Sequence, residues 1–419
     1  MASSPKKQRL SRSPAPRDAC IVAVARTPCG SFQGKLASLS APQLAGVAIR
    51  AAVDRAGISP AQVEELIVGH VLSAGVGQSP AKQAARHAGL PVSVPCSSVN
   101  KVCASGMKAV MFGAQSIQLG LRDVVVVGGM ESMTQAPHMS TKARGGARFG
   151  ELVFCDAIQR DGLFDADENV PMGDLAERCA LQYGISRAAQ DAYAAESYRR
   201  ARQATRDGKF QREIAPVELP ATRSSPAVTV SEDEEVVARD VTLETLAKLR
   251  TCFTAPPEAP AGATVTPGNA SPINDGAAAL VLMSRAKAEA LGVAGRVLAV
   301  VRGFGDAEQD ASAFTTSPSL AIPAALRHAQ LSASDVDFFE INEAFSVVAL
   351  ANAQLLGLDL ATVNVYGGAV AIGHPLGCSG ARIVATLCSV LQQEGGRVGC
   401  AAVCNGGGGA SAVVLEREC

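Results

Sequence analysis

The stretch Val-Cys-Ala-Ser-Gly-Met at residues 102–107 is followed by a helical pattern and then by an apolar run that stops at Gly128-Gly129. Near the other end of the chain, Cys378-Ser379-Gly380 is followed by the same succession, which ends at Cys404. A turn of small residues, a helix and a buried strand in this order predict one unit of an α/β sheet. Because the unit occurs twice, we expect two similar halves related by a pseudo-twofold axis.

A second echo lies upstream of each unit. Residues 57–69 and 331–342 share a helix end, a turn and a strand. Such halves bring the starts of their two long helices together, with Cys103 before one helix and His374 before the other. The elements that we expect are strands at 19–24, 65–72, 123–127 and 337–341 and helices at 41–56, 81–88, 106–119, 174–183 and 187–207.

Between the repeats, regular alternation of strands and helices is lost. Irregular stretches of this length are uncommon inside a compact core, so the segment reads as an inserted surface domain. The expected organisation is a disordered basic tail (1–18), a first half (19–131 and 242–286), an inserted loop domain (132–241) and a second half (287–419).

Composition excludes several classes of protein. The 419 residues suit more than one core, and 38 basic side chains balance 39 acidic ones, so the chain as a whole has no electrostatic reason to bind nucleic acid or an acidic membrane. No run approaches the roughly 20 apolar residues that cross a bilayer. The twelve cysteines are scattered without a CxxC pair, which favours free thiols in a reducing compartment over a disulfide scaffold or a zinc ribbon.

Three residues carry the chemistry that the sequence suggests. Cys103 precedes a helix whose N-terminal end lowers the pKa of a thiol and can hold an oxyanion, and small neighbours let a ligand approach. His374 lies in Gly-His-Pro-Leu-Gly, a directed turn that suits a general base. Cys404 opens Cys-Asn-Gly-Gly-Gly-Gly, where Gly406 and its neighbours can turn backbone N–H groups toward an anion.

Each of these residues also has a plain structural interpretation. A cysteine is more often a small core residue, a turn histidine often bonds to backbone, and a glycine run is often only a tight turn. His70 and His87 read as such ordinary histidines. After the strand at 337–341, Asn342 can hold a water and Glu343 can orient a histidine, or both can be parts of a helix start.

These segments, in this order and spacing, closely resemble the thiolase family, and within it the short-chain biosynthetic type. The resemblance runs from about Ile21 to Leu415. The segments that carry it are Arg26-Thr27-Pro28, Gly69 to Leu72, Asn100 to Lys108, Gly128 to Met133, Asn269-Ala270-Ser271, Asn274 to Ala277, Asn342 to Phe345, Gly367 to Gly377 and Cys404 to Ser411. The implied fold is a five-layered α-β-α-β-α core of two βαβ-type halves with an inserted loop domain.

The resemblance implies a reversible Claisen condensation of two acetyl-CoA to acetoacetyl-CoA and coenzyme A. Cys103 matches the nucleophile that takes the acetyl group, and His374 the base that activates it and, with a water held by Asn342, forms an oxyanion hole. Cys404 matches the acid/base for the second acetyl-CoA. A second oxyanion hole comes from the N–H groups of Cys103 and Gly406. The mechanism is ping-pong, with no covalently bound cofactor.

The resemblance also implies where coenzyme A lies. Ser271 and Arg239 match contacts to the pantetheine and the nucleotide, and Met172 lines the same tunnel. Pro171 stands where many members have a histidine before Met-Gly, which makes the tightness of coenzyme A binding a question. In the same way, Phe314-Thr315 replaces a Phe-Pro pair that helps to admit branched 2-methylacetoacetyl-CoA.

Finer features resemble the potassium-activated, mitochondrial-type subgroup. Its cation-binding positions are matched by Tyr198, Pro267, Gly268, Ala270 and Val370, with Pro267 in place of an alanine. The resemblance further implies a homotetramer, a dimer of dimers. Prolines interrupt the basic first residues, and this argues against a transit peptide, so we expect a cytoplasmic protein with a mitochondrial location as the alternative.

Other functions remain open at this point. A degradative 3-ketoacyl-CoA thiolase acting on longer chains is the rival within the same class. A ketoacyl synthase is disfavoured because such enzymes use a Cys-His-His set. A noncatalytic acyl-CoA-binding protein need not keep Cys103, His374 and Cys404 together, and a metal site on this trio lacks a fourth ligand.

Overall fold

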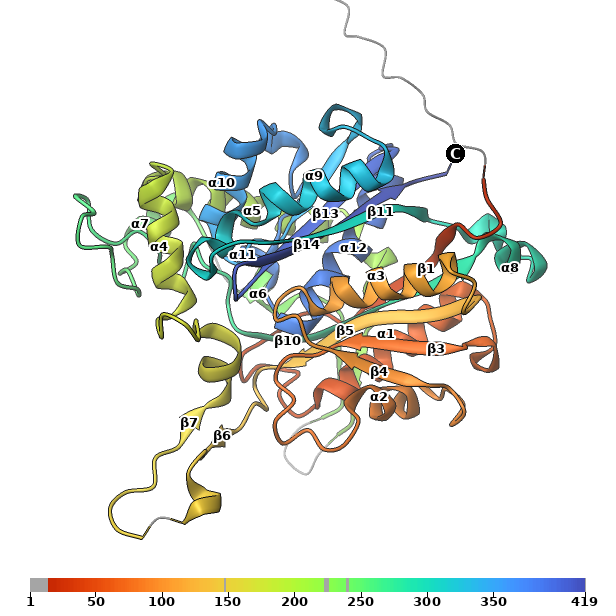
Figure 1. The fold of residues 1–419 in the computed structure, drawn as a ribbon, viewed down its shortest axis with the longest axis horizontal. Coiled ribbons are helices and arrows are strands. Elements are labelled where there is room, and N and C mark those ends of the chain that lie inside the picture. The colour runs from red at the N-terminus through yellow and green to blue at the C-terminus, as the bar shows by residue number, and fades with distance from the viewer. Residues whose placement is uncertain (1–13, 147, 222–225, 239–240, 419) are drawn as a thin grey trace, which may run out of the picture.

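The computed structural model describes residues 14–146, 148–221, 226–238 and 241–418, and strands alternate with helices through both ends of the chain (Figure 1). The α/β class expected from the sequence is confirmed. No helix within the described ranges is long and apolar enough to cross a membrane.

The first half is built on a sheet in the order β4-β3-β5-β10-β1. Its elements are β1 (Ala19–Arg26), β2 (Gly30–Ser31), α1 (Ala41–Ala56), β3 (Glu65–Gly69), α2 (Pro80–Ala88), β4 (Cys96–Val99), α3 (Ser105–Gln118), β5 (Val124–Ser132), β10 (Asn274–Ser284) and α8 (Arg285–Ala290). Strand β3 ends at Gly69 instead of the expected Leu72. The N–H groups of Val71 and Leu72 donate to the carboxylate of Glu131 and so leave the sheet.

The second half repeats this arrangement in the order β12-β13-β14-β11. Its elements are β11 (Ala299–Glu308), α9 (Pro318–Ala329), β12 (Phe338–Ile341), α10 (Ser346–Leu356), α11 (Ala369–Ile372), α12 (Leu376–Gln393), β13 (Val398–Asn405) and β14 (Gly409–Glu416). Strands β3 and β12 each run parallel to the next strand of the order, and the two pairings that follow are antiparallel in both halves. This confirms the internal repeat, and β1 pairs with β11 to join the two sheets edge to edge.

The layers follow from which faces are apolar (Figure 1). Helices α1 and α2 cover the outer face of the first sheet, α9 and α10 cover the outer face of the second, and α3 and α12 are buried between the sheets. Helix α12 is buried along almost its whole length, so that even the polar residues on one of its faces, Ser379, Arg382, Thr386 and Ser389, are enclosed by the protein. The five expected layers are present.

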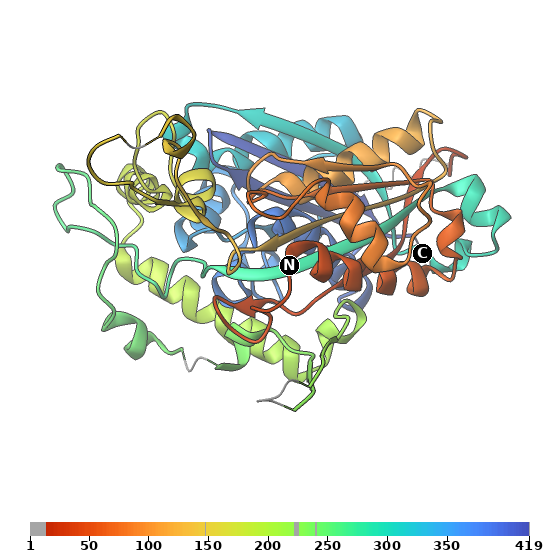
Figure 2. The same cartoon turned by 90° about the horizontal axis from the view of Figure 1, so that it is seen from below.

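The insert holds short strands and two longer helices. They are β6 (His138–Met139), β7 (Cys155–Asp156), α4 (Met172–Gln182), α5 (Arg187–Arg206), β8 (Val217–Leu219), β9 (Val228–Val230) and α6 (Glu234–Ala238), and α7 (Leu243–Ala247) follows the insert. Helices α4 and α5 lie where the sequence predicted them, and Figure 2 shows α5, in light green, running along one side of the layered core. Glu177 of α4 accepts from the N–H groups of Thr264 and Val265, so part of 242–273 packs on the insert before β10 begins.

Residues 14–18, which the expected basic tail includes, are described in the structure and contact the rest of the chain. Arg17 donates to the carbonyl of Arg122 at 2.7 Å and pairs with Asp123, and the N–H of Ala286 donates to the carbonyl of Pro16. These contacts tie Pro16 and Arg17 to the first turn of α8 and to the turn between α3 and β5. The rest of the expected tail, residues 1–13, lies outside the described residues.

Candidate active site

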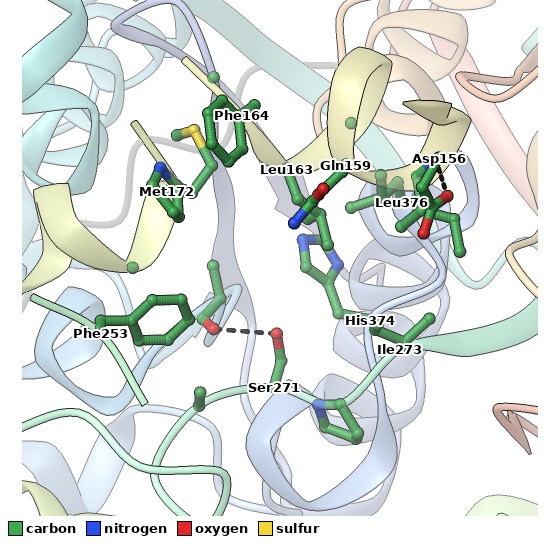
Figure 3. Close-up of a pocket in the computed structure, with 18 of the residues that line it drawn as sticks. Asp156, Gln159, Leu163, Phe164, Met172, Phe253, Ser271, Ile273, His374 and Leu376 are labelled. Carbon is green, nitrogen blue, oxygen red and sulfur yellow. Dashed lines mark hydrogen bonds between the residues drawn. The ribbon is translucent and has the colours of Figure 1, made fainter. Parts of the chain in front are cut away.

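A cleft of about 1730 Å³ opens where the insert meets both halves (Figure 3). Among the residues singled out in the sequence, those that line it are Cys103, Pro171, Met172, Pro267, Ala270, Ser271, Phe314, His374 and Gly406. Asn342 and Cys404 are buried next to it, with 1 % of each residue exposed. The repeat therefore does what the sequence predicted and brings Cys103 of the first half to His374 of the second.

Cys103 follows a strained turn. Val102 has φ +46°, a left-handed conformation that is rare for a β-branched residue. The turn is held because the N–H of Val102 donates to Oδ1 of Asn100 at 2.9 Å, while the hydroxyl of Ser105 donates to the carbonyl of Val102 at 2.5 Å. Helix α3 then begins at Ser105, so the thiol lies at the helix start, as expected.

The electrostatics of Cys103 differ from the expectation. Burial raises the pKa of its thiol to about 12, and hydrogen bonds from the N–H groups of Gly406 and of Cys103 itself offset only part of that rise. Loss of hydration outweighs the lowering of the pKa that we expected from the helix end. The resting residue is a thiol, and its deprotonation needs a base.

His374 supplies a neutral imidazole. Its backbone N–H donates to Oδ1 of Asn274 at 3.1 Å, which fixes the turn between α11 and α12. Ring Nδ1 lies 2.6 Å from Oγ of Ser379, and that hydroxyl donates to the carbonyl of Pro375 at 2.9 Å. In this chain of bonds Nδ1 carries the proton, and Nε2 is left as an acceptor.

The surroundings of His374 keep it unprotonated. Burial, and to a smaller extent the guanidinium of Arg382, lower the pKa of the imidazole to about 3. Asn342 approaches the same ring, with Nδ2 at 3.4 Å from Nε2 and 3.5 Å from Nδ1. Its Oδ1 is buried without a hydrogen-bond partner among the described residues. An unpaired acceptor beside His374 is what a bound water would satisfy.

Glu343 has a different task from the one that the sequence suggested. Its carboxylate accepts from Tyr193, Ser197, Asn364 and the N–H of Val370, at 2.8 to 3.1 Å. These partners join α5 and α11 to the end of β12. The expectation that Glu343 orients a histidine is therefore wrong, because its bonds hold the insert against the second half.

Cys404 ends β13 behind the cleft. Burial raises the pKa of its thiol, and a charge on Cys103 would raise it further, which couples the two thiols electrostatically. Gly406 follows, and a Cβ there would lie 3.7 Å from the methionine methyl of Met172 and from a methyl of Val102. The N–H groups of Gly406 and Cys103 both reach the Cys103 sulfur, so they converge on one point.

The outer cleft is lined by the insert and by the segment that precedes β10. Figure 3 shows Met172, Phe253 and Ser271 around its opening, and Gln159 directed toward the His374 ring. Oγ of Ser271 donates to the carbonyl of Ala344 at 2.9 Å. Pro171 forms an isolated β-bridge with Phe164, and its side chain offers no polar group to the cleft. Arg239 lies outside the described residues.

Several lining residues were missed in the sequence. Gln159 and Leu163 come from a single π-helical turn, Ile158–Leu163, and Phe253 comes from the irregular segment after α7. A π-helical turn has no periodic signal in the sequence, although such turns are frequent at functional sites. For Gln159 and Leu163, the only sequence signal of a binding role was their position in a long insert in which strands and helices do not alternate.

The five positions matched to a cation are partly gathered. Tyr198 and Val370 share one buried cluster, and Gly268 packs so closely on Leu246 that a Cβ would lie 2.4 Å from a leucine methyl. Ala270 forms an isolated β-bridge with Phe345. Carbonyl and phenol oxygens are hard donors, which suit an alkali cation. No group of three or more His, Cys, Asp or Glu residues within the described ranges is arranged to hold a metal.

The depressed pKa of His374 makes a prediction about stability. The unfolded chain gains a proton on this residue below about pH 6.5, whereas the folded chain stays neutral to about pH 3, so folding stability falls as the pH drops through this window. At pH 5 the expected loss is about 2 kcal/mol. The variant His374→Ala should not show this loss of folding stability, whereas His87→Ala, a change at an exposed residue, should show it in full. Urea unfolding at pH 7 and pH 5 tests this, and equal losses in wild type and His374→Ala contradict it.

Comparisons with known proteins agree with the fold. The model of the thiolase N-terminal domain matches residues 19–286, and that of the thiolase C-terminal domain matches residues 295–417. The chain is 52% identical over 397 residues to a protein of Schizosaccharomyces pombe named acetyl-CoA acetyltransferase, covering 95% of this chain and 98% of that one.

Two further relatives show the same degree of likeness. Acetyl-CoA acetyltransferase 2 of Arabidopsis thaliana is 54% identical over 406 residues, which cover 97% of this chain and 98% of that protein. A protein of Gibberella zeae named acetyl-CoA acetyltransferase ERG10, cytosolic, is 52% identical over 396 residues, with 94% and 97% covered. With both domain models matched in order and the two halves folded as described, the chain belongs to the thiolase family.

Proposed function

We propose that the protein is an acetyl-CoA C-acetyltransferase, an acyltransferase that condenses two acetyl-CoA to acetoacetyl-CoA and coenzyme A and also runs in reverse. The observation that carries the proposal is the meeting of the Cys103 thiol and neutral His374 at one cleft, with the Cys404 thiol buried beside it. The names of the relatives support this substrate over the longer chains of a degradative thiolase.

In the first half-reaction, Nε2 of His374 takes the proton of Cys103, and the sulfur attacks the thioester carbon of acetyl-CoA. The carbon–sulfur bond to coenzyme A breaks, and the leaving thiolate takes the proton back from His374. A thiol with a pKa of about 12 forms a strong nucleophile once its proton is removed. The first oxyanion is held by His374 and by a water on Asn342.

In the second half-reaction, Cys404 acts on the next acetyl-CoA. Neutral His374 takes the proton of the Cys404 thiol, and the thiolate so formed removes a proton from the methyl carbon. The resulting carbanion attacks the acetyl group on Cys103, the bond from the acetyl carbon to the Cys103 sulfur breaks, and the departing Cys103 thiolate takes the proton held by His374 as acetoacetyl-CoA is released. The N–H groups of Cys103 and Gly406 stabilise the second oxyanion in a site from which burial excludes water.

Coenzyme A lies along the insert in this proposal. The pantetheine passes Met172 and Ser271, and the nucleotide reaches Arg239. Phe253, Phe164 and Pro171 give the opening an apolar wall, which suits a pantetheine arm more than a charged group. Pro171 removes the polar contact that a histidine would make, so binding relies on packing there.

Two cysteine variants test the division of labour. Cys103→Ala is expected to lose thiolysis of acetoacetyl-CoA by about 10³-fold or more and to form no acetyl-enzyme. Cys404→Ala is expected to accept a radioactive acetyl group from acetyl-CoA and yet to condense nothing, because only the second half-reaction needs its proton transfer. Cys400→Ala, a buried thiol on the same strand, serves as the control and stays active. Turnover by Cys103→Ala would refute the nucleophile.

We also propose that potassium activates the enzyme at the site matched by Tyr198, Pro267, Gly268, Ala270 and Val370. Two observations support this site. Tyr198 and Val370 belong to one buried cluster, and Val370 lies in α11, four residues before His374. Thiolysis in potassium chloride is expected to exceed that in sodium chloride at the same ionic strength, and Tyr198→Phe is expected to abolish the difference. An equal response of wild type and variant contradicts this site.

A homotetramer is proposed as the assembly. The arm that carries β6 and β7 projects away from the core (Figure 1), and it exposes Phe149 fully and Val153 to 72 %. Apolar side chains this exposed at a projecting tip suit burial against other subunits. Phe149→Asp with Val153→Asp is expected to yield dimers in sedimentation, whereas Val92→Asp, equally exposed elsewhere, keeps the larger species. Tetramers in the arm variant would contradict the proposal.

The compartment proposed is the cytoplasm, with the mitochondrion as the alternative. The name of the Gibberella zeae relative, which includes the word cytosolic, supports the first. Cell fractionation with antibodies against the protein distinguishes the two.

A further inference from the structure

Glu131 is a buried carboxylate that the mechanism does not use. It lies near the end of β5 with none of its surface exposed, and it accepts three backbone hydrogen bonds. Two come from Val71 and Leu72 of the first half, each at 3.1 Å, and the third comes from Gly377 of the second half at 2.9 Å. One carboxylate thus joins the first turn of α12 to the other half of the molecule.

The internal repeat shows which residue of the first half corresponds to Gly377. A Cβ on Gly106 would lie 2.8 Å from the nitrogen of Ala381, and one on Gly380 would lie 2.4 Å from the nitrogen of Met107. These reciprocal approaches make Gly106 and Gly380 equivalent about the pseudo-twofold axis. Counting back from each, Gly377 corresponds to Cys103, whose N–H helps to hold the reaction's oxyanion.

The two helix starts therefore present equivalent N–H groups to different anions. At α3 the N–H of Cys103 faces the cleft, where the oxyanion forms during the reaction. At α12 the N–H of Gly377 donates to the carboxylate of Glu131. The start of α12 is an anion site that the protein itself fills.

The fit at this point is tight. A Cβ on Gly377 would lie 2.6 Å from the carbonyl oxygen of Met130 and 3.0 Å from Oε2 of Glu131, and a Cβ on Gly129 would lie 2.0 Å from the carbonyl oxygen of Gly377. Only glycines allow the strand and the helix start to approach so closely. The side chain of Leu376 packs with those of Val71 and Leu72 beside the same bonds.

We propose that Glu131 is a positioning residue for His374. Only two residues, Pro375 and Leu376, separate His374 from Gly377, and Pro375 stiffens the turn between them. Fixing the N–H of Gly377 therefore fixes the imidazole relative to Cys103, which belongs to the half that carries Glu131. Without the carboxylate, three buried N–H groups lose their acceptor and the turn is free to shift. The inference rests on the proposed role of His374 as the base.

Rescue of a truncated variant by a small carboxylate tests the proposal. Glu131→Ala is expected to lower kcat about 10- to 100-fold, as for a small misplacement of a reacting group, with the KM for coenzyme A unchanged within about twofold. Sodium formate should occupy the vacated site and raise kcat at least about fivefold, saturably, whereas sodium chloride at equal ionic strength should not. Wild type should not respond to formate.

A matched variant separates positioning from stability. Glu177→Ala removes another buried carboxylate that accepts N–H bonds, from Thr264 and Val265, and its kcat should not respond to formate. Glu131→Asp keeps the charge but falls one carbon short of Gly377, and it supplies the result if Glu131→Ala does not fold. In Glu131→Asp, the rate of alkylation of Cys103 by iodoacetamide at pH 7 should fall by about the same factor as kcat.

Two results would overturn the inference. One is a folded Glu131→Ala or Glu131→Asp with the kcat of wild type, and the other is a loss of kcat in Glu131→Ala that formate does not restore. Its failure is distinct from failure of the proposed function. An active His374→Ala refutes the base itself, whereas an inactive His374→Ala beside a fully active Glu131→Ala refutes only the positioning by Glu131.

Discussion

The close approach of α3 and α12 is the constraint on which the rest of the structure depends. At Gly106 and Gly380 a single added carbon would lie within 3 Å of the backbone of the other helix. Close-packed interiors leave no room for such an atom, so the spacing of the helix starts is fixed by the absence of side chains. Cys103 stands before one start and His374 before the other, and their separation is therefore set by backbone packing.

Burial between two sheets also determines the protonation states of the site. Loss of hydration disfavours every charged form, so it raises the pKa of both thiols and lowers that of His374. The resting site is neutral, and each charge appears only as a proton passes between groups in contact. Fixed N–H donors then contribute most, because water does not compete with them in such a place.

The sequence predicted those features of the fold and of the site that glycine-rich motifs and the internal repeat indicate. It placed Cys103 and His374 before equivalent helices, and their meeting at the cleft follows from the pseudo-twofold axis. It did not predict the raised pKa of Cys103, because the depth of burial depends on α12, more than 250 residues further along the chain. Nor did it predict Gln159, which a π-helical turn places near His374, or the end of β3 at Gly69, which the distant Glu131 causes.

Duplication of a half with one helix start at its centre creates two potential anion sites, and a single active site needs only one of them open. The second start still carries unpaired N–H groups that burial makes costly unless an acceptor reaches them. A carboxylate from the opposite half satisfies them and adds a bond across the axis, which a bound water would not do with the same rigidity. On this argument the asymmetry between Cys103 and Gly377 is a single division of function: one N–H is kept for the reaction, and its counterpart is used to hold the base in place.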